Sequence, residues 1–373
     1  MRARPFPNFI CMTRRSFAMI LGASAAWSQR VAGKRSVSSP ARGEITRFYD
    51  PVTENIVARL TDPRTNSRLP ALQNRFVSAR NHFLLFSSDR SGRMAPFHLD
   101  LRTGALRQLA RPERLDPKSL CMDEKERWLY FLDGQSLNEV ALGNLRRRTI
   151  AEGVTAFAMG ASGADLVVVK DRRLQRLEAG KAVPVAGNAT GAIVRPGATG
   201  CAFWRDEPRP KMEFWYSPFP PPEQEPKLLT SGAVVNPIWA PHGESLLFLR
   251  EIVIPPRDAG AEPITTAEIH EVSISSGIDL RIASTSQFAA FTPNANGSVY
   301  VGASRSKAQP TVLLLLHATG REFTLCEHKA SDAAAVSPVF SPNSQRVYFQ
   351  SDREGKWVLY SVNVEKLIEP TNI

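Results

Sequence analysis

A frame that recurs along the chain is the feature that most constrains its fold. Each copy has an aromatic or apolar residue, a polar turn and an apolar strand, and the copies at 76–92 and 340–355 also share a Ser-Asp-Arg-x-Gly turn. Seven copies start at residues 76, 122, 157, 194, 239, 291 and 340, and the 264 residues from first to last start give a mean spacing of 44. This period matches the roughly 40–50 residues of one four-stranded propeller blade.

A single four-stranded blade cannot bury both of its apolar faces, so blades stack around an axis and cover one another. The sequence therefore predicts an all-β fold, a seven-bladed β-propeller of four-stranded antiparallel blades, as one domain over residues 36–373. An earlier strand pair, 45–49 and 56–60, is expected to join the last blade and close the ring, which removes an exposed sheet edge. A pair of open β-sandwiches or two unrelated β domains is the alternative.

The first 35 residues differ in composition from the rest. They contain seven Lys and Arg and no acidic residue, and Arg14-Arg15-Ser-Phe17 precedes a short apolar run. Paired arginines before an apolar run too short to span a bilayer are typical of a bacterial twin-arginine export signal. We therefore expect a leader over 1–35, with a start at Met1 or Met12, a periplasmic or extracellular protein, and no membrane span in the mature chain. An ordinary amphipathic N-terminal helix is the alternative.

The charge balance argues against a nucleic-acid partner. The whole chain carries +11, but the leader accounts for +7 and leaves an ordinary +4 for the remainder. Arg146-Arg147-Arg148 lacks the interleaved aromatic side chains on which single-stranded bases stack. Cys121, Cys201 and Cys326 show neither disulfide nor zinc spacing and are expected to be buried. We expect a monomer.

Residues 203–216 are the most suggestive segment for binding. They place Arg205, Arg209 and Lys211 among aromatic residues in a Pro-containing connection between two strands. Cationic groups pair with carboxylates and aromatic faces stack on sugar rings, so this segment at a channel mouth would suit an acidic sugar. Packing of its aromatic residues on a neighbouring blade is the alternative. The six histidines show no metal-ligand spacing; among them His328 is a candidate, although a single His more often has a structural role.

With the repeats placed, the chain resembles the oligogalacturonate lyase family of seven-bladed propellers. Residues 49–61 resemble that family's opening hairpin, 84–109 its first full blade, and 319–328 with 338–360 its last blade. The resemblance implies β-elimination of short galacturonate oligomers. A divalent metal such as manganese, held by His and Gln, draws charge from the uronate carboxylate while a basic residue removes the neighbouring C5 proton. TolB-like propellers share the same blade frame.

The chain departs from the family at the matching ligand positions. Asn236 and Ala290 stand where the family has His, and Asp332-Ala-Ala-Ala-Val-Ser-Pro338 replaces a Gln and a His-Pro-His run. Asn236 and Asp332 are oxygen donors, but two such groups do not complete the usual shell of about six oxygens around a hard cation. No metal ligand is assigned. Lys211 lies beside the position of the family's basic residue.

Two functions are therefore considered. The first is an exported lyase-like enzyme that cleaves uronate oligosaccharides, as in pectin breakdown. Its catalytic base would be Lys211, its substrate-binding residues would be Arg205, Arg209, Asn236, Asp332 and His328, and manganese or another divalent cation would be its cofactor if the family chemistry is retained. The second is a non-catalytic TolB-like propeller that binds a glycan or an envelope protein. The expected partner is an acidic oligosaccharide or an envelope protein.

Overall fold

Contacts within the chain divide it into two units, Met1–Ser39 and Pro40–Ile373. The computed structural model describes residues 44–160, 165–178, 180–206, 212–221, 225–255, 264–285 and 287–369, all of which belong to the second unit. The expected leader lies outside the described residues. Among the residues that are described, no helix is long and apolar enough to span a membrane.

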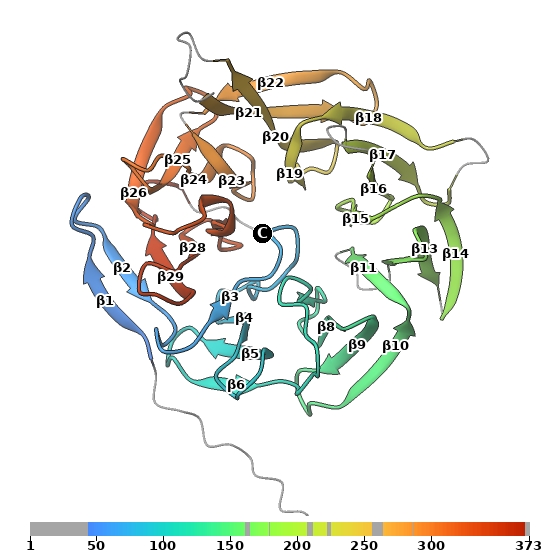
Figure 1. Cartoon of the computed structure of the whole chain (residues 1–373), viewed down its shortest axis with the longest axis horizontal. Helices are drawn as coiled ribbons and strands as arrows, with labels where there is room; N and C mark the ends of the chain where they lie inside the picture. The colour runs from blue at the N-terminus through green and yellow to red at the C-terminus, as the bar shows by residue number, and fades with distance from the viewer. Residues whose placement is uncertain are drawn as a thin grey trace, which may run out of the picture. The chain divides into compact units, whose positions relative to one another are not determined.

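The described residues form seven antiparallel sheets arranged around one axis (Figure 1). Six sheets have four strands each, in chain order from one edge to the other, and the seventh has five. We number the blades along the chain, and strands β3, β11, β15, β19 and β23 lie nearest the centre in Figure 1. The predicted seven-bladed β-propeller with four-stranded antiparallel blades is confirmed.

The strands that form blades 1 to 3 are β3 (Ser67–Arg68), β4 (Phe83–Ser88), β5 (Ala95–Asp100) and β6 (Leu106–Gln108); β7 (Cys121–Met122), β8 (Trp128–Asp133), β9 (Ser136–Ala141) and β10 (Arg147–Glu152); and β11 (Val154–Met159), β12 (Leu166–Lys170), β13 (Arg173–Glu178) and β14 (Lys181–Ala186). The strands of blades 4 to 6 are β15 (Gly191–Val194), β16 (Gly200–Asp206), β17 (Met212–Pro218) and β18 (Lys227–Gly232); β19 (Val234–Trp239), β20 (Ser245–Ile254), β21 (Ile264–Ser273) and β22 (Asp279–Ser284); and β23 (Phe288–Pro293), β24 (Val299–Ser304), β25 (Thr311–Leu316) and β26 (Glu322–Glu327). Blade 7 contains β27 (Val339–Phe340), β28 (Arg346–Ser351) and β29 (Val358–Asn363), joined by β2 (Ile56–Arg59) and β1 (Thr46–Tyr49). A short 3-10 helix, η1 (Ala333–Ala335), precedes β27.

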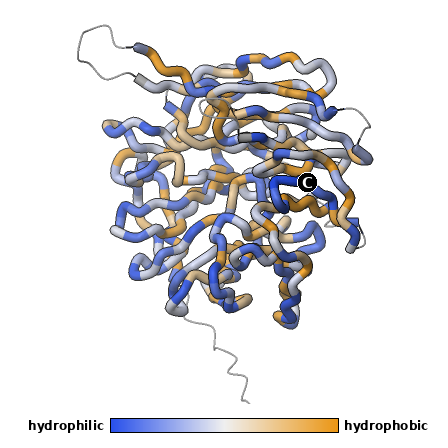
Figure 2. The backbone as a smooth tube through the Cα atoms, turned by 45° about the vertical axis from the view of Figure 1, so that its right-hand side comes forward, coloured by the Kyte–Doolittle hydropathy of each residue, from blue (hydrophilic) through white to orange (hydrophobic). Residues whose placement is uncertain are grey.

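The ring is held by apolar contacts between neighbouring blades. One hydrophobic cluster joins blade 1 to blades 2 and 7, and five others join blades 2 and 3, 3 and 4, 4 and 5, 5 and 6, and 6 and 7. Each blade thus buries its two apolar faces against two neighbours, as the stacking of propeller blades requires. Figure 2 shows the hydrophobic stretches along the strands, separated by hydrophilic turns.

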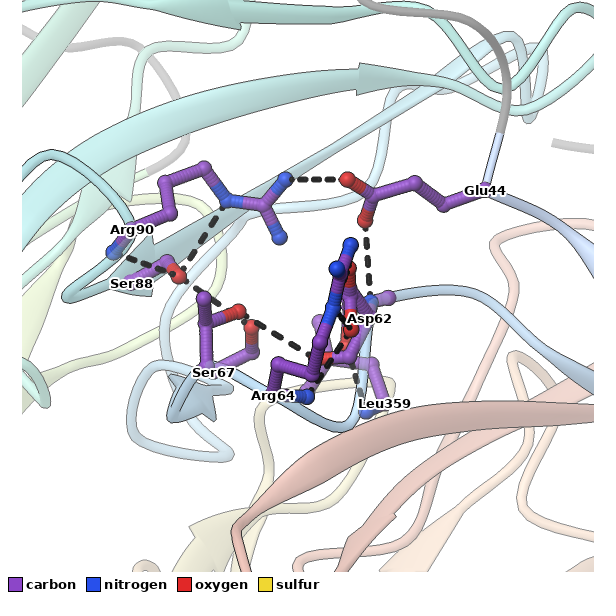
Figure 3. Close-up of polar contacts among 9 residues, drawn as sticks. Glu44, Asp62, Arg64, Ser67, Ser88, Arg90 and Leu359 are labelled. Atoms are coloured by element: carbon purple, nitrogen blue, oxygen red, sulfur yellow. Dashed lines mark hydrogen bonds and ion pairs between the residues drawn. The ribbon is translucent and has the colours of Figure 1, made fainter.

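The N-terminal strand pair closes the ring as expected. Strand β2 pairs with β29 in blade 7, and the backbone N–H of Leu60 donates to the carbonyl of Leu359 at 2.7 Å. Glu44, just before β1, accepts a hydrogen bond from Arg90 of blade 1 at 2.9 Å and one from the backbone N–H of Asp62 at 2.9 Å (Figure 3). The start of the described chain therefore ties blade 7 to blade 1.

The Ser-Asp-Arg-x-Gly turns have a structural role in both copies. Asp89 accepts a hydrogen bond from the backbone N–H of Asn66 at 2.9 Å, and Asp352 accepts one from the backbone N–H of Ser331 at 2.8 Å. In each case the aspartate connects the turn after a blade's second strand to the segment before its innermost strand. Such side-chain acceptors for loop N–H groups explain why the turn repeats at equivalent positions.

Candidate functional site

The antiparallel blades give the ring two faces with different loops. We call the face where the innermost strands begin the upper face; the connections between second and third strands also lie there. On this face a hollow of about 540 Å³ opens at the axis, and we call it the upper hollow. Its residues come from β3 and the segment after it, the segment before β7, the start of β19, η1 and β28. Its polar side chains are those of Arg68, Gln73, Lys118, Asn236, Ser337 and Gln350.

Arg68 is the central feature of the upper hollow. Its guanidinium lies over the ring of Trp357, with 3.9 Å between the guanidinium carbon and the ring centroid. Within the described residues its side chain makes no ion pair and no hydrogen bond, although Asp352 and Asp332 are near enough to act on it electrostatically. Burial lowers the pKa of Arg68, but a guanidinium stays charged at any physiological pH. A half-buried cation without a bonded anion is thus exposed to the hollow.

The other polar groups of the upper hollow fix its walls. Gln350 accepts a hydrogen bond from the backbone N–H of Leu69 at 2.7 Å and donates one to the carbonyl of Ala335 at 2.5 Å. Lys118 is exposed and adds a second positive charge. No carboxylate is among the residues that line this hollow. The hollow therefore presents two cations on a rigid frame and favours an anionic ligand.

A second hollow of about 690 Å³, which we call the side hollow, lies on the other side of η1. Two predicted site residues, His328 and Asp332, line it, together with Arg305. Arg305 donates to a carboxylate oxygen of Glu251 at 2.9 Å, and Asp332 accepts from the backbone N–H of Ala334 at 3.0 Å as the N-cap of η1. Both charged groups are thus engaged within the fold.

His328 is buried and both of its ring nitrogens have partners. Nδ1 lies 3.0 Å from the backbone N–H of Ala330, which donates to it, and Nε2 lies 2.9 Å from the carbonyl of Ser304. This pairing requires a neutral ring with its proton on Nε2. Burial lowers the pKa of His328, which keeps the ring neutral. The ring therefore holds the loop before η1 in place.

Asn236 connects two blades. Its side-chain amide donates to the carbonyl of Phe291 at 3.0 Å and accepts from the backbone N–H of Phe291 at 3.4 Å. Its φ of 56° lies in the left-handed region, where Asn is tolerated better than most residues, and the pairing of β19 with β20 shifts register between Val235 and Ile238. Asn236 lines the upper hollow, but its amide is used by the blade contact.

Of the segment singled out at 203–216, the structure describes the parts that belong to β16 and β17. Arg205 lies over the ring of Trp215, at 4.4 Å from its centroid, and donates to the carbonyl of Gly187 at 3.2 Å. Arg205 and Trp215 both belong to blade 4, so this contact is internal to one blade. The packing on a neighbouring blade that was the alternative is seen for Phe203 and Trp215, which share an apolar cluster with residues of blade 3. Arg209 and Lys211 lie outside the described residues, so their predicted roles remain predictions.

The described residues do not fit a divalent-metal centre of the kind that the resemblance implies. In the described part of the chain, no three His, Cys, Asp or Glu side chains gather closely enough to hold a metal ion. Asn236 uses its amide on Phe291, and Asp332 caps η1. Since both oxygen donors are used by the fold and no group of three ligands gathers among the described residues, we derive no chemical step through a metal.

Comparison with solved structures agrees with this architecture. An oligogalacturonate lyase from Vibrio parahaemolyticus matches with a TM-score of 0.75 and 17% identity, over 87% of this chain and 98% of its own. An oligogalacturonate lyase in complex with manganese matches with a TM-score of 0.76 and 18% identity, over 87% and 97%. The chain has the fold of these lyases. At such identity the likeness establishes the fold alone.

Other comparisons add little about function. A chain of the mitotic checkpoint complex matches with a TM-score of 0.55 and 13% identity, over 94% of this chain and 99% of its own. TolB from Acinetobacter baumannii matches with a TM-score of 0.43, too low to support any inference. No family model and no curated protein matches the sequence.

The sequence reasoning missed the residues that give the upper hollow its charge. Arg68 lies before the first frame and Trp357 lies in the last blade, so their contact joins opposite ends of the chain. No local pattern marks either residue. The one available signal was the placement of blade 7 beside blade 1, which follows from a closed ring.

Proposed function

We propose that this propeller binds short acidic oligosaccharides of the uronate type in the upper hollow. The observation that carries the proposal is Arg68, a half-buried guanidinium that has no bonded anion among the described residues. A guanidinium binds a carboxylate through two parallel hydrogen bonds, and Trp357 fixes its plane by stacking. The ligand's carboxylate would take the place beside Arg68, with Lys118 near a second one.

The shape and charge of the site favour a small anion. The hollow of about 540 Å³ falls within the range of small-ligand sites, roughly 300–1,000 Å³. Its position on the axis, beneath the loops of the upper face, suits a short chain that enters from one side. The charge of the remainder of the chain, +4 outside residues 1–35, gives no support to a nucleic-acid ligand.

Titration calorimetry with trigalacturonate tests the proposal. We expect saturable binding by the full chain, and Arg68→Gln should weaken it about 10-fold, because one charge-assisted bidentate contact is lost. Arg64→Gln is the matched control, since Arg64 is exposed and pairs with Asp62 outside the hollow. A neutral galactose trimer should bind far more weakly. Equal affinities for the two variants, or for the two trimers, would refute the proposal.

A second candidate is β-elimination of the bound oligosaccharide, favoured by the shared fold with oligogalacturonate lyases. Lys211 would take the C5 proton of the uronate, the C5–H electron pair would form the C4=C5 double bond, and the C4–O bond would break. The leaving oxygen would take a proton from water, so the products would be an unsaturated uronate and a chain with a free hydroxyl. Ultraviolet absorbance of the unsaturated product is the readout, with and without manganese. Lys211→Ala should abolish it and Lys227→Ala should not. No absorbance rise with any divalent metal would exclude this candidate while leaving the binding proposal open.

We also propose export by the twin-arginine route. The support is the Arg14-Arg15-Ser-Phe17 sequence before a short apolar run. Replacement of both arginines by lysine should retain the protein in the cytoplasm of a bacterial host, as judged by cell fractionation. Unchanged release to the periplasm would show another route.

A further inference from the structure

A third hollow lies on the axis at the opposite end, where the innermost strands finish. We call it the lower hollow; its volume is about 360 Å³, and each of the seven blades contributes to its lining. None of the sequence predictions and none of the proposals above uses it. Its polar side chains are those of Gln73, Arg75, Arg195, Trp239 and Thr292.

The segment that follows β3, the innermost strand of blade 1, lies between this hollow and the upper one. Leu72 and Gln73 line both hollows, so one stretch of chain forms the wall between them. Hydrogen bonds hold the stretch on two sides: the backbone N–H of Ala71 donates to the carbonyl of Lys118 at 3.0 Å, and the backbone N–H of Met122 donates to the carbonyl of Arg75 at 2.7 Å. The two hollows are therefore two sites.

The lower hollow has uncompensated positive charge. Arg75 and Arg195 are half-buried, no carboxylate is among the lining residues, and neither arginine forms an ion pair within the described ranges. Arg195 donates to the carbonyl of Gly243 at 2.5 Å and to the hydroxyl of Tyr216 at 3.4 Å, while Arg75 donates to the carbonyl of Glu124 at 3.4 Å. Carbonyl and hydroxyl acceptors orient the guanidinium groups without neutralising them.

An aromatic ring lies in the same hollow. Trp239 is half-buried, and its indole N–H donates to the carbonyl of Ile193 at 3.2 Å. Tyr216 packs against it edge-on, with 6.2 Å between ring centroids and 79° between planes. Tyr216 also accepts the hydrogen bond from Arg195, so its side chain contacts both the Trp239 ring and the Arg195 guanidinium. A fixed aromatic face beside guanidinium groups suits a ligand that is both flat and anionic.

We propose that the lower hollow is a second binding site, for a small organic anion that has one ring. The carboxylate of the ligand pairs with Arg195, which Tyr216 connects to Trp239, and the ring of the ligand packs on Trp239. Arg75 adds a second positive charge to the lining of the hollow. This site and the upper hollow share only Leu72 and Gln73 among their lining residues, and the charged residues of the two are different.

The test uses the full chain and three probes: benzoate, monomeric galacturonate and inorganic phosphate. Tryptophan fluorescence and calorimetry follow binding, and a ligand-dependent rise in melting temperature gives a readout that needs no variant. We expect saturable binding of benzoate, weakened at least about 10-fold by Arg195→Gln, weakened also by Arg75→Gln, and unchanged by Arg64→Gln, since Arg64 pairs with Asp62 outside both hollows. Arg195→Lys should bind more tightly than Arg195→Gln but more weakly than the unchanged protein, because an ammonium group cannot make the two parallel hydrogen bonds of a guanidinium.

Three results would overturn the proposal. One is the absence of saturable binding or thermal stabilisation with all three probes. Another is phosphate binding as tightly as the ring-bearing anions, which would remove the role of Trp239. The third is weakening of benzoate binding by Arg68→Gln equal to that by Arg195→Gln, which would place benzoate in the upper hollow. If Arg195→Gln fails to fold, Arg75→Gln decides, since its side chain makes only one long hydrogen bond.

Discussion

At the scale of single residues, side chains with functional chemistry separate into those used by the fold and those left open. Asn236 joins two blades, and His328 binds a loop through both ring nitrogens. Arg68, in contrast, has a stacking partner and no bonded anion among the described residues. The residue type alone therefore could not show which of these side chains is free to bind a ligand. The bonding partners of each side chain lie in other blades, far away in the sequence.

His98 predicts a pH dependence of stability. Burial lowers its pKa from 6.5 to about 4, and its ring stacks on Phe83 at 4.5 Å. Between these two pH values the unfolded chain binds more protons than the folded chain, so the free energy of unfolding falls as the pH falls. Urea unfolding at pH 7 and pH 5 should show a loss to which His98 contributes about 1 kcal/mol after solvent screening. His98→Gln should reduce that loss; an unchanged loss would contradict this assignment.

At the scale of elements, the strands and turns of each blade could be predicted from the sequence, but the segment that lies across the axis could not. Six of the seven predicted starts lie in the innermost strand of a different blade, and the seventh, residue 76, lies beside the isolated bridge between Val77 and Leu84 in blade 1. Periodic apolar residues and turn acceptors such as Asp100, which binds the backbone N–H of Thr103 at 2.7 Å, are local features that a sequence displays directly. The segment that carries Leu72 and Gln73 is held by hydrogen bonds to blade 2 and blade 7, so no local sequence pattern predicts its position.

The tip of the β1–β2 hairpin predicts a measurable contribution to stability. Asp50 is buried and accepts hydrogen bonds from the backbone N–H groups of Val52, Thr53 and Glu327, the last in blade 6, at 2.9–3.1 Å. Asp50→Ala leaves these donors without an acceptor and should lower the free energy of unfolding by about 3 kcal/mol. Val52→Ala, at an exposed position of the same turn, should cost at most about 0.5 kcal/mol. Similar losses in urea unfolding would contradict the role of Asp50.

At the scale of the whole propeller unit, closure by β2 is the feature on which the ring depends. The pairing of β2 with β29 covers an edge that would otherwise offer unpaired backbone groups to another chain. A variant that lacks residues 44–60 should therefore self-associate and melt at a lower temperature. Size-exclusion chromatography with light scattering measures this against the full chain, for which we expect a monomer. A truncated chain that stays monomeric with an unchanged melting temperature would show that closure is not required.

Closure also explains how much of the site the sequence could reveal. The prediction of an axial channel with a basic mouth followed from the repeat and from the cationic segment at 203–216. The contact of Arg68 with Trp357, and the lower hollow with its seven contributors, exist only once the ends of the chain meet. Such sites belong to the ring and have no counterpart in any single blade.

The central claim is that a uronate carboxylate binds beside Arg68 at the upper end of the axis. A crystal of the full chain soaked with trigalacturonate tests it most directly. The account predicts difference density in the upper hollow, with one carboxylate within hydrogen-bonding distance of the Arg68 guanidinium, which still lies over Trp357. Density only in the side hollow, or an upper hollow that stays empty while the protein binds the sugar in solution, would contradict it.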